Sequence, residues 1–250
     1  MTPIIQVGDL IILAQELVPM LASYNLLPQF LQGVIIDQAI ASIESTDEEI
    51  AIARQKFLEK HQLTTEEACH AWIKQRGLSP NQLDEIALHD LKLEKYKTTT
   101  WGHQIESYFL QRKDKLDRVL YSLIRVQDAG LAQELYFRIH DDSQPFVELA
   151  REYSQGQEAQ TGGLIGPVEL NTPHPILARM LSISQPGQIW APTRVGEWYV
   201  ILRLEKFLPA KLDESMRQRL LNEMFTTWLQ ETLQKTPVRF LPGTESPTND

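Results

Sequence analysis

A few hydrogen-bonding side chains stand inside two apolar runs in the second half of the chain. Tyr121 and Ser122 lie within the run 119–126, and Tyr199 lies within the run 198–204. A phenol or hydroxyl group can donate a hydrogen bond to a bound substrate, although the same residues are also ordinary components of a strand. The motifs G-x-x-x-x-G-K, G-x-S-x-G and H-E-x-x-H do not occur in the sequence, so nothing indicates phosphate cradling, an activated serine or a zinc protease.

The elements around these residues can be predicted from apolar spacing. The run 119–126 alternates enough for a first strand, and 198–204 is apolar enough for a buried strand, with a short strand optional at 189–191. Helices are expected at 129–139, 145–153 and 175–182. In the second of these, the residues Phe146, Leu149, Ala150 and Tyr153 follow the i, i+3, i+4, i+7 spacing of one helix face. A glycine turn at 162–163 and a Pro-Gly turn at 186–187 separate these elements. An antiparallel sheet with helices around it is an α+β module.

Four stretches in this order resemble the parvulin-type peptidyl-prolyl isomerase domain. They are 145–154 (PFVELAREYS), 162–166 (GGLIG), 185–189 (QPGQI) and 199–205 (YVILRLE). The resemblance can be followed from about residue 118 to residue 208, roughly the length of one such domain. It implies a fold in which a first strand, short helices and a closing strand surround a proline-binding pocket. It also implies rotation about X-Pro peptide bonds as the activity.

The resemblance carries the proline pocket over to an apolar set of positions. The pocket falls at Pro173, Leu177 and Leu181, with Met180 as an alternative to Leu181. Leu177 and Leu181 are also four residues apart on a predicted helix, so they could simply be its inward face.

The polar centre of the family does not carry over. The first-strand histidine aligns with Leu123, and the last-strand histidine aligns with Val200, or with Tyr199 if the register differs by one. The family's Cys or Asp position falls near Gln155. We therefore expect Tyr199, Ser122 and Gln155 to supply any hydrogen bonds that the site makes.

The two ends of the chain are predicted to be helical and to form one lobe. Residues 1–116 contain apolar stripes, among them one that begins at Leu10, with proline and capping signals between them. The helix at 213–234 carries a wide stripe that must be buried: Met216, Leu220, Met224 and Trp228. Packing this helix on the N-terminal helices gives a lobe that resembles the SurA and PrsA class of bacterial foldases. The expected division is a helical domain 1–116, a parvulin-like domain 117–208, a C-terminal helix 209–235 that packs on the first domain, and a disordered tail 236–250.

Composition excludes several classes of protein. The net charge of −9 argues against a nucleic-acid surface, which needs clustered Lys and Arg. The single cysteine, Cys69, allows no intrachain disulfide. The first residues have no basic region, and the apolar run 10–14 is too short for a signal segment or a membrane span. We therefore expect a cytoplasmic location, with no membrane insertion. No metal site or cofactor is expected, because Cys69 and His70 are adjacent and point to different helix faces.

Two functions of different classes follow from these observations. The first is a peptidyl-prolyl isomerase that acts on proline-containing peptides or unfolded client proteins and relies mainly on desolvation. The second is a chaperone or peptide-docking module that binds such chains without catalysis, in the service of a bacterial export system. The sequence leaves open whether a homodimer forms by exchange of the terminal helix.

Overall fold

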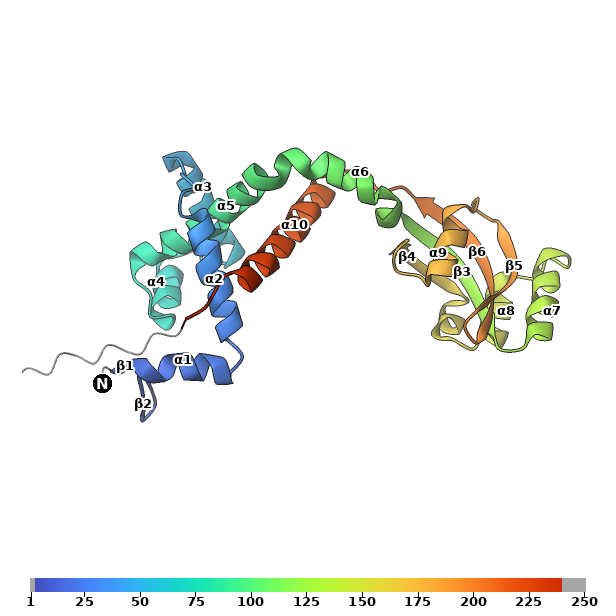
Figure 1. The fold of residues 1–250 in the computed structure, drawn as a ribbon, viewed down its shortest axis with the longest axis horizontal. Coiled ribbons are helices and arrows are strands. Elements are labelled where there is room, and N and C mark those ends of the chain that lie inside the picture. Colours follow the sequence, from blue (N-terminus) through green and yellow to red (C-terminus); the bar gives the residue numbers. More distant parts are fainter. Residues whose placement is uncertain (1–2, 240–250) are drawn as a thin grey trace, which may run out of the picture. The chain divides into compact units, whose positions relative to one another are not determined.

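The computed structural model describes residues 3–239, and the side chains of all of these except Pro80 and Asn81. The chain divides into two compact units. One unit combines Met1–Ile105 with Gln218–Asp250, and the other is Glu106–Arg217 (Figure 1). The predicted domain boundaries near residues 116 and 208 stay predictions, and the predicted disordered tail falls mostly at 240–250, outside the described residues.

The first unit begins with a β-hairpin, where we predicted helix. Strand β1 (Pro3–Val7) pairs antiparallel with β2 (Leu10–Leu13), with Val7 opposite Leu10. The stripe assigned to a helix from Leu10 is therefore wrong at its start. Gly8 has φ of +59°, a conformation that glycine adopts without strain, and it lets the chain reverse between two runs rich in β-branched isoleucine.

Helices follow the hairpin, as the apolar stripes and capping signals predict. They are α1 (Ala14–Ser23), α2 (Leu27–Ile40), α3 (Asp47–Lys60), α4 (Glu66–Gln75) and α5 (Pro80–Trp101), followed by the short η1 (Gly102–Gln104). Thr46 caps α3 through a capping box with Glu49, as its sequence indicates. Pro19 lies inside α1 and does not end it.

The C-terminal helix α10 (Glu214–Lys235) packs on α5, which confirms that both chain ends contribute to one helical unit (Figure 1). Trp228 lies 5.4 Å from Tyr96 and 6.0 Å from Trp101, measured between ring centroids. Lys97 of α5 donates to the Asn222 side chain of α10 at 2.8 Å. Of the predicted stripe, Leu220 is buried, whereas Met216, Met224 and Trp228 are only half-buried, so its burial is less complete than predicted. Among the described residues, no helix has the length and apolarity needed to cross a membrane.

The second unit holds a four-stranded antiparallel sheet, which confirms the α+β class. Helix α6 (Ile105–Leu116) leads into it. The strands are β3 (Arg118–Val126), β4 (Leu164–Glu169), β5 (Ile189–Val195) and β6 (Trp198–Leu208), in the order β4-β3-β6-β5. Strand β6 lies inside the sheet, and the burial that its apolar sequence predicts is confirmed. Strand β4 was not predicted, because its Gly-Pro sequence indicates a turn; the structure pairs Ile165 with Tyr121.

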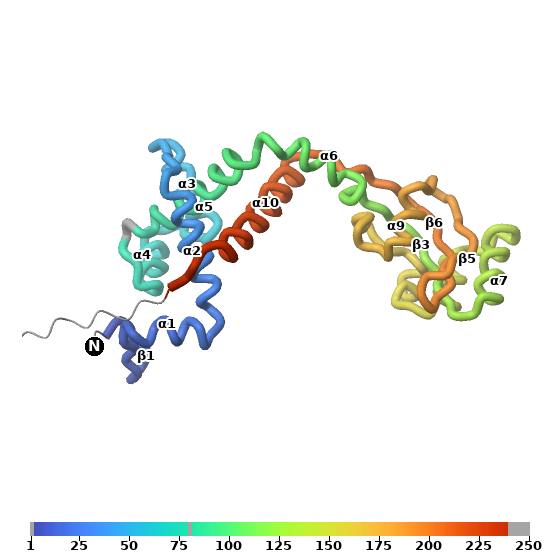
Figure 2. Tube along the Cα trace, viewed as in Figure 1, coloured from blue at the N-terminus to red at the C-terminus, as the bar shows by residue number. Residues whose placement is uncertain are grey.

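Each face of this sheet has its own helices and its own core. Helix α9 (Pro175–Ser182) covers one face, where Leu123 and Val200 lie in the same cluster as α9 residues. Helices α7 (Ala129–His140) and α8 (Phe146–Tyr153) cover the other face, and the 3-10 helix η2 (Gln157–Thr161) follows α8. The path of the chain through these elements can be followed in Figure 2. The two faces decide which side chains can meet in one site.

Candidate functional site

The predicted pocket residues lie on α9 and on the segment that precedes it. Leu177, Met180 and Leu181 form the inward face of this helix. They are largely buried, with Leu177 and Met180 7% exposed and Leu181 fully buried. Pro173 is half-buried just before the helix. The N-terminus of α9 is fixed locally, because the His174 Nδ1 accepts a hydrogen bond from the Ile176 amide at 3.3 Å and Pro175 occupies the first turn.

Both positions at which the family carries histidine face α9. Leu123 pairs with Leu202 and Val200 pairs with Arg125 in the β3–β6 ladder. Leu123 and Val200 belong to the same buried cluster as Leu177 and Leu181. The geometry therefore places Val200, and not Tyr199, on the face that α9 covers.

The structure does not bring Tyr199 or Ser122 to that face. Successive side chains of a strand alternate between the two faces, so both residues point toward α7 and α8. Tyr199 packs against the cluster formed with these helices. Ser122 is buried and donates its hydroxyl hydrogen bond to Glu205, which also accepts from Arg203 Nε at 2.7 Å. Any hydrogen bond that Tyr199 or Ser122 makes to a substrate would therefore come from the face opposite the predicted pocket.

Gln155 lies at the end of β3, where it connects the loop after α8 to the strand. Its amide N–H donates to the Arg125 carbonyl at 2.9 Å, and its side-chain Oε1 accepts from the Gln127 amide at 3.1 Å. Gln155 is exposed, so its remaining amide group faces solvent. These hydrogen bonds join Gln155 to the backbone of Arg125 and Gln127.

Two charged residues that sequence reasoning missed form the polar group of this face. Arg125 Nε lies 3.0 Å from Glu158 Oε1, and Nη2 donates to Oε2 at 3.0 Å. The Glu158 side chain is only 5% exposed. Ser154 Oγ donates to Oε1 at 2.7 Å and accepts from the Arg125 amide at 3.1 Å. A signal was present in the sequence: Arg125 is the one charged residue in the otherwise uncharged run 119–126.

Glu158 also acts on Tyr121, which stands on the same face. Burial raises the pKa of the Tyr121 phenol, and the negative charge of Glu158 raises it further. The phenol therefore stays protonated at neutral pH. Tyr121, Leu123 and Arg125 alternate along β3 and share one face, so Glu158 acts on the residues on both sides of Leu123.

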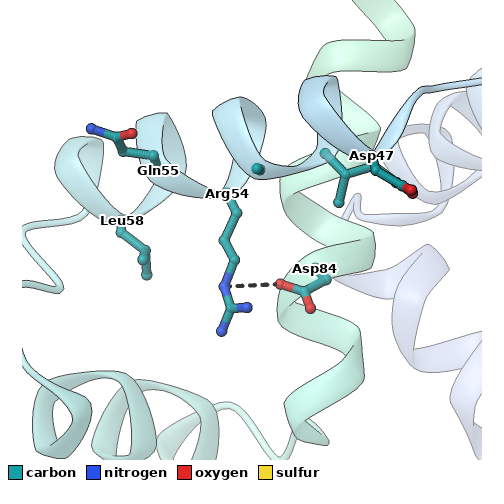
Figure 3. Close-up of a pocket in the computed structure, with 7 residues that line it drawn as sticks. Asp47, Arg54, Gln55, Leu58 and Asp84 are labelled. Atoms are coloured by element: carbon teal, nitrogen blue, oxygen red, sulfur yellow. Dashed lines mark ion pairs between the residues drawn. The ribbon is translucent and has the colours of Figure 1, made fainter.

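A separate cleft lies in the first unit, between α3 and α5 (Figure 3). It has a volume of about 450 Å³, and an ion pair of 3.3 Å joins Arg54 and Asp84 at its wall. None of the predicted site residues lines it, and its apolar lining residues are few: Ile50, Ala51 and Leu58. We place the candidate site in the second unit instead, where apolar and polar groups converge on one sheet face. Within the described part of the chain, no cluster of three or more His, Cys, Asp or Glu residues is arranged to hold a metal ion.

Comparison with known protein families decides what this second unit is. Residues 125–206 match the family described as "Rotamase: PPIC-type PPIASE domain". This part of the chain is a PPIC-type rotamase domain. The match runs from Arg125 in β3 to Lys206 in β6, and so includes α9 and the Arg125–Glu158 pair.

Parts of the chain larger than the rotamase domain are similar to a chaperone and to peptidylprolyl isomerases. The chain is 27% identical over 184 residues to "Chaperone SurA" of Vibrio parahaemolyticus. This alignment covers 68% of this chain but only 40% of the length of that protein. A crystal structure of "Peptidylprolyl Isomerase (PrsA)" from Bacillus cereus aligns with a TM-score of 0.50 at 17% identity, covering 97% of this chain and 95% of that one. The PrsA structure from Bacillus anthracis aligns with a TM-score of 0.47 at 20% identity, over 85% and 100% of the two chains. The chain therefore combines a rotamase domain with helices from both chain ends, in a fold similar to that of the Bacillus cereus structure.

Proposed function

We propose that this protein is a foldase that catalyses cis-trans isomerisation of X-Pro bonds in client polypeptides. The observation that carries the proposal is the rotamase domain at 125–206. Its helix α9 presents apolar side chains to the sheet face that holds Leu123 and Val200, the two positions aligned with the family's histidines. The helical unit would bind the same unfolded or proline-containing clients. A role beside a bacterial export system and a homodimer remain part of this proposal.

The chemistry requires rotation about a peptide bond and no covalent step. The barrier is about 18–20 kcal/mol, and an X-Pro bond crosses it unaided in tens to hundreds of seconds. An apolar pocket that holds the proline ring and removes water from the imide lowers this barrier, because the twisted amide is less polar than the planar one. Hydrogen bonds that suit the twisted state add to the effect. Leu177, Met180 and Leu181 are the proposed pocket.

A second function, binding without catalysis, is favoured by one observation. Leu123 and Val200 occupy the family histidine positions, and both are buried apolar core residues, 6% and 3% exposed. Their side chains cannot donate or accept hydrogen bonds. A domain with this core could still bind an extended peptide on its surface and hold it against aggregation.

An isomerisation assay on a panel of X-Pro peptides separates the two functions. We expect acceleration above the uncatalysed rate, and a fall of roughly tenfold or more in Leu177→Ala and Leu181→Ala. The matched control is Ile176→Ala on the same helix, because Ile176 is 41% exposed and points away from the core. Thermal unfolding of each variant shows whether a lost rate reflects lost folding. No acceleration by the intact protein, with peptide binding retained, would leave the binding function alone.

We further propose that the protein works in the cytoplasm. The support is its cysteine usage: the single Cys69 gives no sign of the disulfide framework typical of oxidising compartments. Cell fractionation tests this, and recovery only in periplasmic or secreted fractions would contradict it.

A further inference from the structure

Arg125 stands directly beside one of the family histidine positions. It pairs with Val200 in the β3–β6 ladder. Directly opposed residues of antiparallel strands share a face, with Cβ atoms about 4.5–5.5 Å apart. The cationic side chain therefore leaves the sheet on the side that α9 covers, next to the buried cluster that contains Val200 and Leu177.

Two contacts hold the Arg125 side chain in place while part of it stays open. One edge of the guanidinium, formed by Nε and Nη2, faces the Glu158 carboxylate at 3.0 Å. Its central carbon lies 5.5 Å from the ring centroid of Trp198, which itself packs on the α9-facing cluster. The side chain is still 34% exposed. Within residues 3–239, the structure shows no hydrogen bond to Nη1, the nitrogen away from the carboxylate.

The loop after α8 is built around this guanidinium. Ser154 orients the Glu158 carboxylate by donating to it at 2.7 Å. A Cβ at Gly156 would overlap both Nε and Nη2 of Arg125 and would also meet Glu158 Oε2. Only glycine at this position leaves the ion pair room. Glu158, Ser154 and Gly156 therefore position Arg125, whereas Arg125 has the exposed donor.

An X-Pro segment has a hydrogen-bonding pattern that such a donor fits. Proline carries a carbonyl but no N–H, so the backbone around an X-Pro bond offers acceptors in excess of donors. An arginine side chain offers donors and no acceptor. Because Glu158 neutralises the guanidinium charge, the exposed edge suits a neutral carbonyl oxygen better than a client carboxylate.

We propose that Arg125 contacts the client directly, by donating a hydrogen bond from Nη1 to a backbone carbonyl next to the bound proline. Glu158 and Gly156 are positioning residues for this contact. The inference rests on the proposed function and deepens it, since it names the group that binds the client backbone. It differs from a purely structural ion pair, which would fasten the loop to β3 and leave client affinity unchanged.

The test uses the full chain and four variants. Arg125→Met removes the donors while keeping much of the length of the side chain, and Arg125→Lys keeps the charge without the fork. Gly156→Ala displaces the guanidinium and removes no donor. The control is Arg194→Met, because Arg194 is exposed and pairs with Tyr199, on the opposite face. For each variant, kcat, KM and the peptide Kd are measured at low and high salt on an X-Pro peptide with an uncharged flanking residue, together with Tm.

We expect Arg125→Met and Gly156→Ala to raise KM and Kd about tenfold, the effect of losing one hydrogen bond from a charged group, with kcat within about twofold. Arg125→Lys should recover part of the affinity, and Arg194→Met should leave it unchanged. Salt should have little effect on the affinity of the intact protein. A steep loss of affinity with salt would overturn the carbonyl as the acceptor.

Unchanged KM and Kd in Arg125→Met and Gly156→Ala would overturn the inference while leaving the proposed function standing. If the intact protein neither binds nor isomerises the peptides, the proposed function fails and the inference fails with it. Should a variant not fold, the Nε–Hε resonance of Arg125 in the unmutated protein replaces it. A shift of that resonance on titration with peptide supports the contact, and an unmoved resonance at saturation overturns it.

Discussion

At the residue scale, the Glu49 carboxylate of the helical unit accepts hydrogen bonds from two different elements at once. Its carboxylate accepts from the Thr46 amide at 2.9 Å, which completes the capping box of α3. It also accepts from Lys95 Nζ at 2.8 and 2.9 Å, which ties α3 to α5. The hydrogen bond from Lys95 is the largest cause that lowers the pKa of Glu49, and the one from the Thr46 amide is the next.

This lowered pKa predicts how stability depends on pH. A carboxyl whose folded pKa lies below its ordinary value of 4.5 stabilises the fold above that value. The contribution is lost as the pH falls from 4.5 through the folded pKa. We expect Glu49→Gln to be less stable than the unmutated protein at pH 7, with the difference closing below pH 4.5. Denaturant titrations across this range measure it.

Glu48→Gln is the matched control, because it removes the same charge from the first turn of the same helix. It should show a smaller pH-dependent difference than Glu49→Gln. Equal behaviour of the two variants would mean that the helix dipole, and not the contacts of Glu49, is responsible.

At the element scale, the packing of α8 against β3 depends on a close approach at Gly163. Its carbonyl accepts from the Leu123 amide at 2.9 Å, just before β4 begins. Its φ is +86°, and a Cβ there would lie 2.8 Å from the Leu123 carbonyl oxygen and 3.0 Å from both Ala150 and Phe146. The glycine lets the chain pass between the helix and the strand, which is how the loop carrying Glu158 comes to lie over β3.

Gly163→Ala should therefore be strongly destabilising. We expect a loss of several kcal/mol, because about 1–3 kcal/mol of backbone strain adds to about 1–3 kcal/mol of overpacking. Gly187→Ala is the control, since Gly187 has φ of +84° and a Cβ added there would meet no atom of the described residues within 4 Å. It should cost only the strain. Urea titrations measure the free energy of unfolding of both variants. Equal losses in Gly163→Ala and Gly187→Ala would show that the close contact at Gly163 costs nothing.

At the scale of the whole molecule, the two chain ends build one unit and the middle builds the other. The closing contact in the first unit is aromatic, with Trp101 packed against both Phe225 and Trp228 of α10. We propose that the rotamase domain, predicted at 117–208, is an insertion whose core does not depend on this contact. The separate cores of its two sheet faces support this proposal.

Phe225→Ala tests this division. Phe225 is 9% exposed, and truncating a buried phenylalanine costs about 3–5 kcal/mol. We expect faster hydrogen–deuterium exchange in Met1–Ile105 and α10, with protection of β3 and β6 unchanged. Phe137→Ala, at a residue 48% exposed on α7, should leave the exchange of the first unit as it is. Loss of protection in both units of Phe225→Ala would show that they unfold together.

Local signals were enough to predict much of this protein. The capped helix starts at Thr46 and Ser79, the bounds of α9 and the burial of β6 follow from residues close together in the chain. The order of the parvulin-like stretches likewise predicted the family of the second unit. Each of these predictions depends on residue spacing within one element or on the order of elements along the chain. Spacing and order can be read directly from the sequence.

Only the tertiary structure decided which side chains meet. Neighbouring residues of a strand lie on opposite faces of the sheet, so a register that differs by one residue moves every side chain to the other face. The observed register places Val200 on the face that α9 covers and places Tyr199 and Ser122 on the opposite face. Arg125 and Glu158 are 33 positions apart, and no local pattern links them. The sequence by itself determined that a rotamase domain forms within a helical frame. The folding of the loop after α8 onto β3 decided that its polar group is an arginine held by a buried carboxylate, because only packing brings such distant residues together.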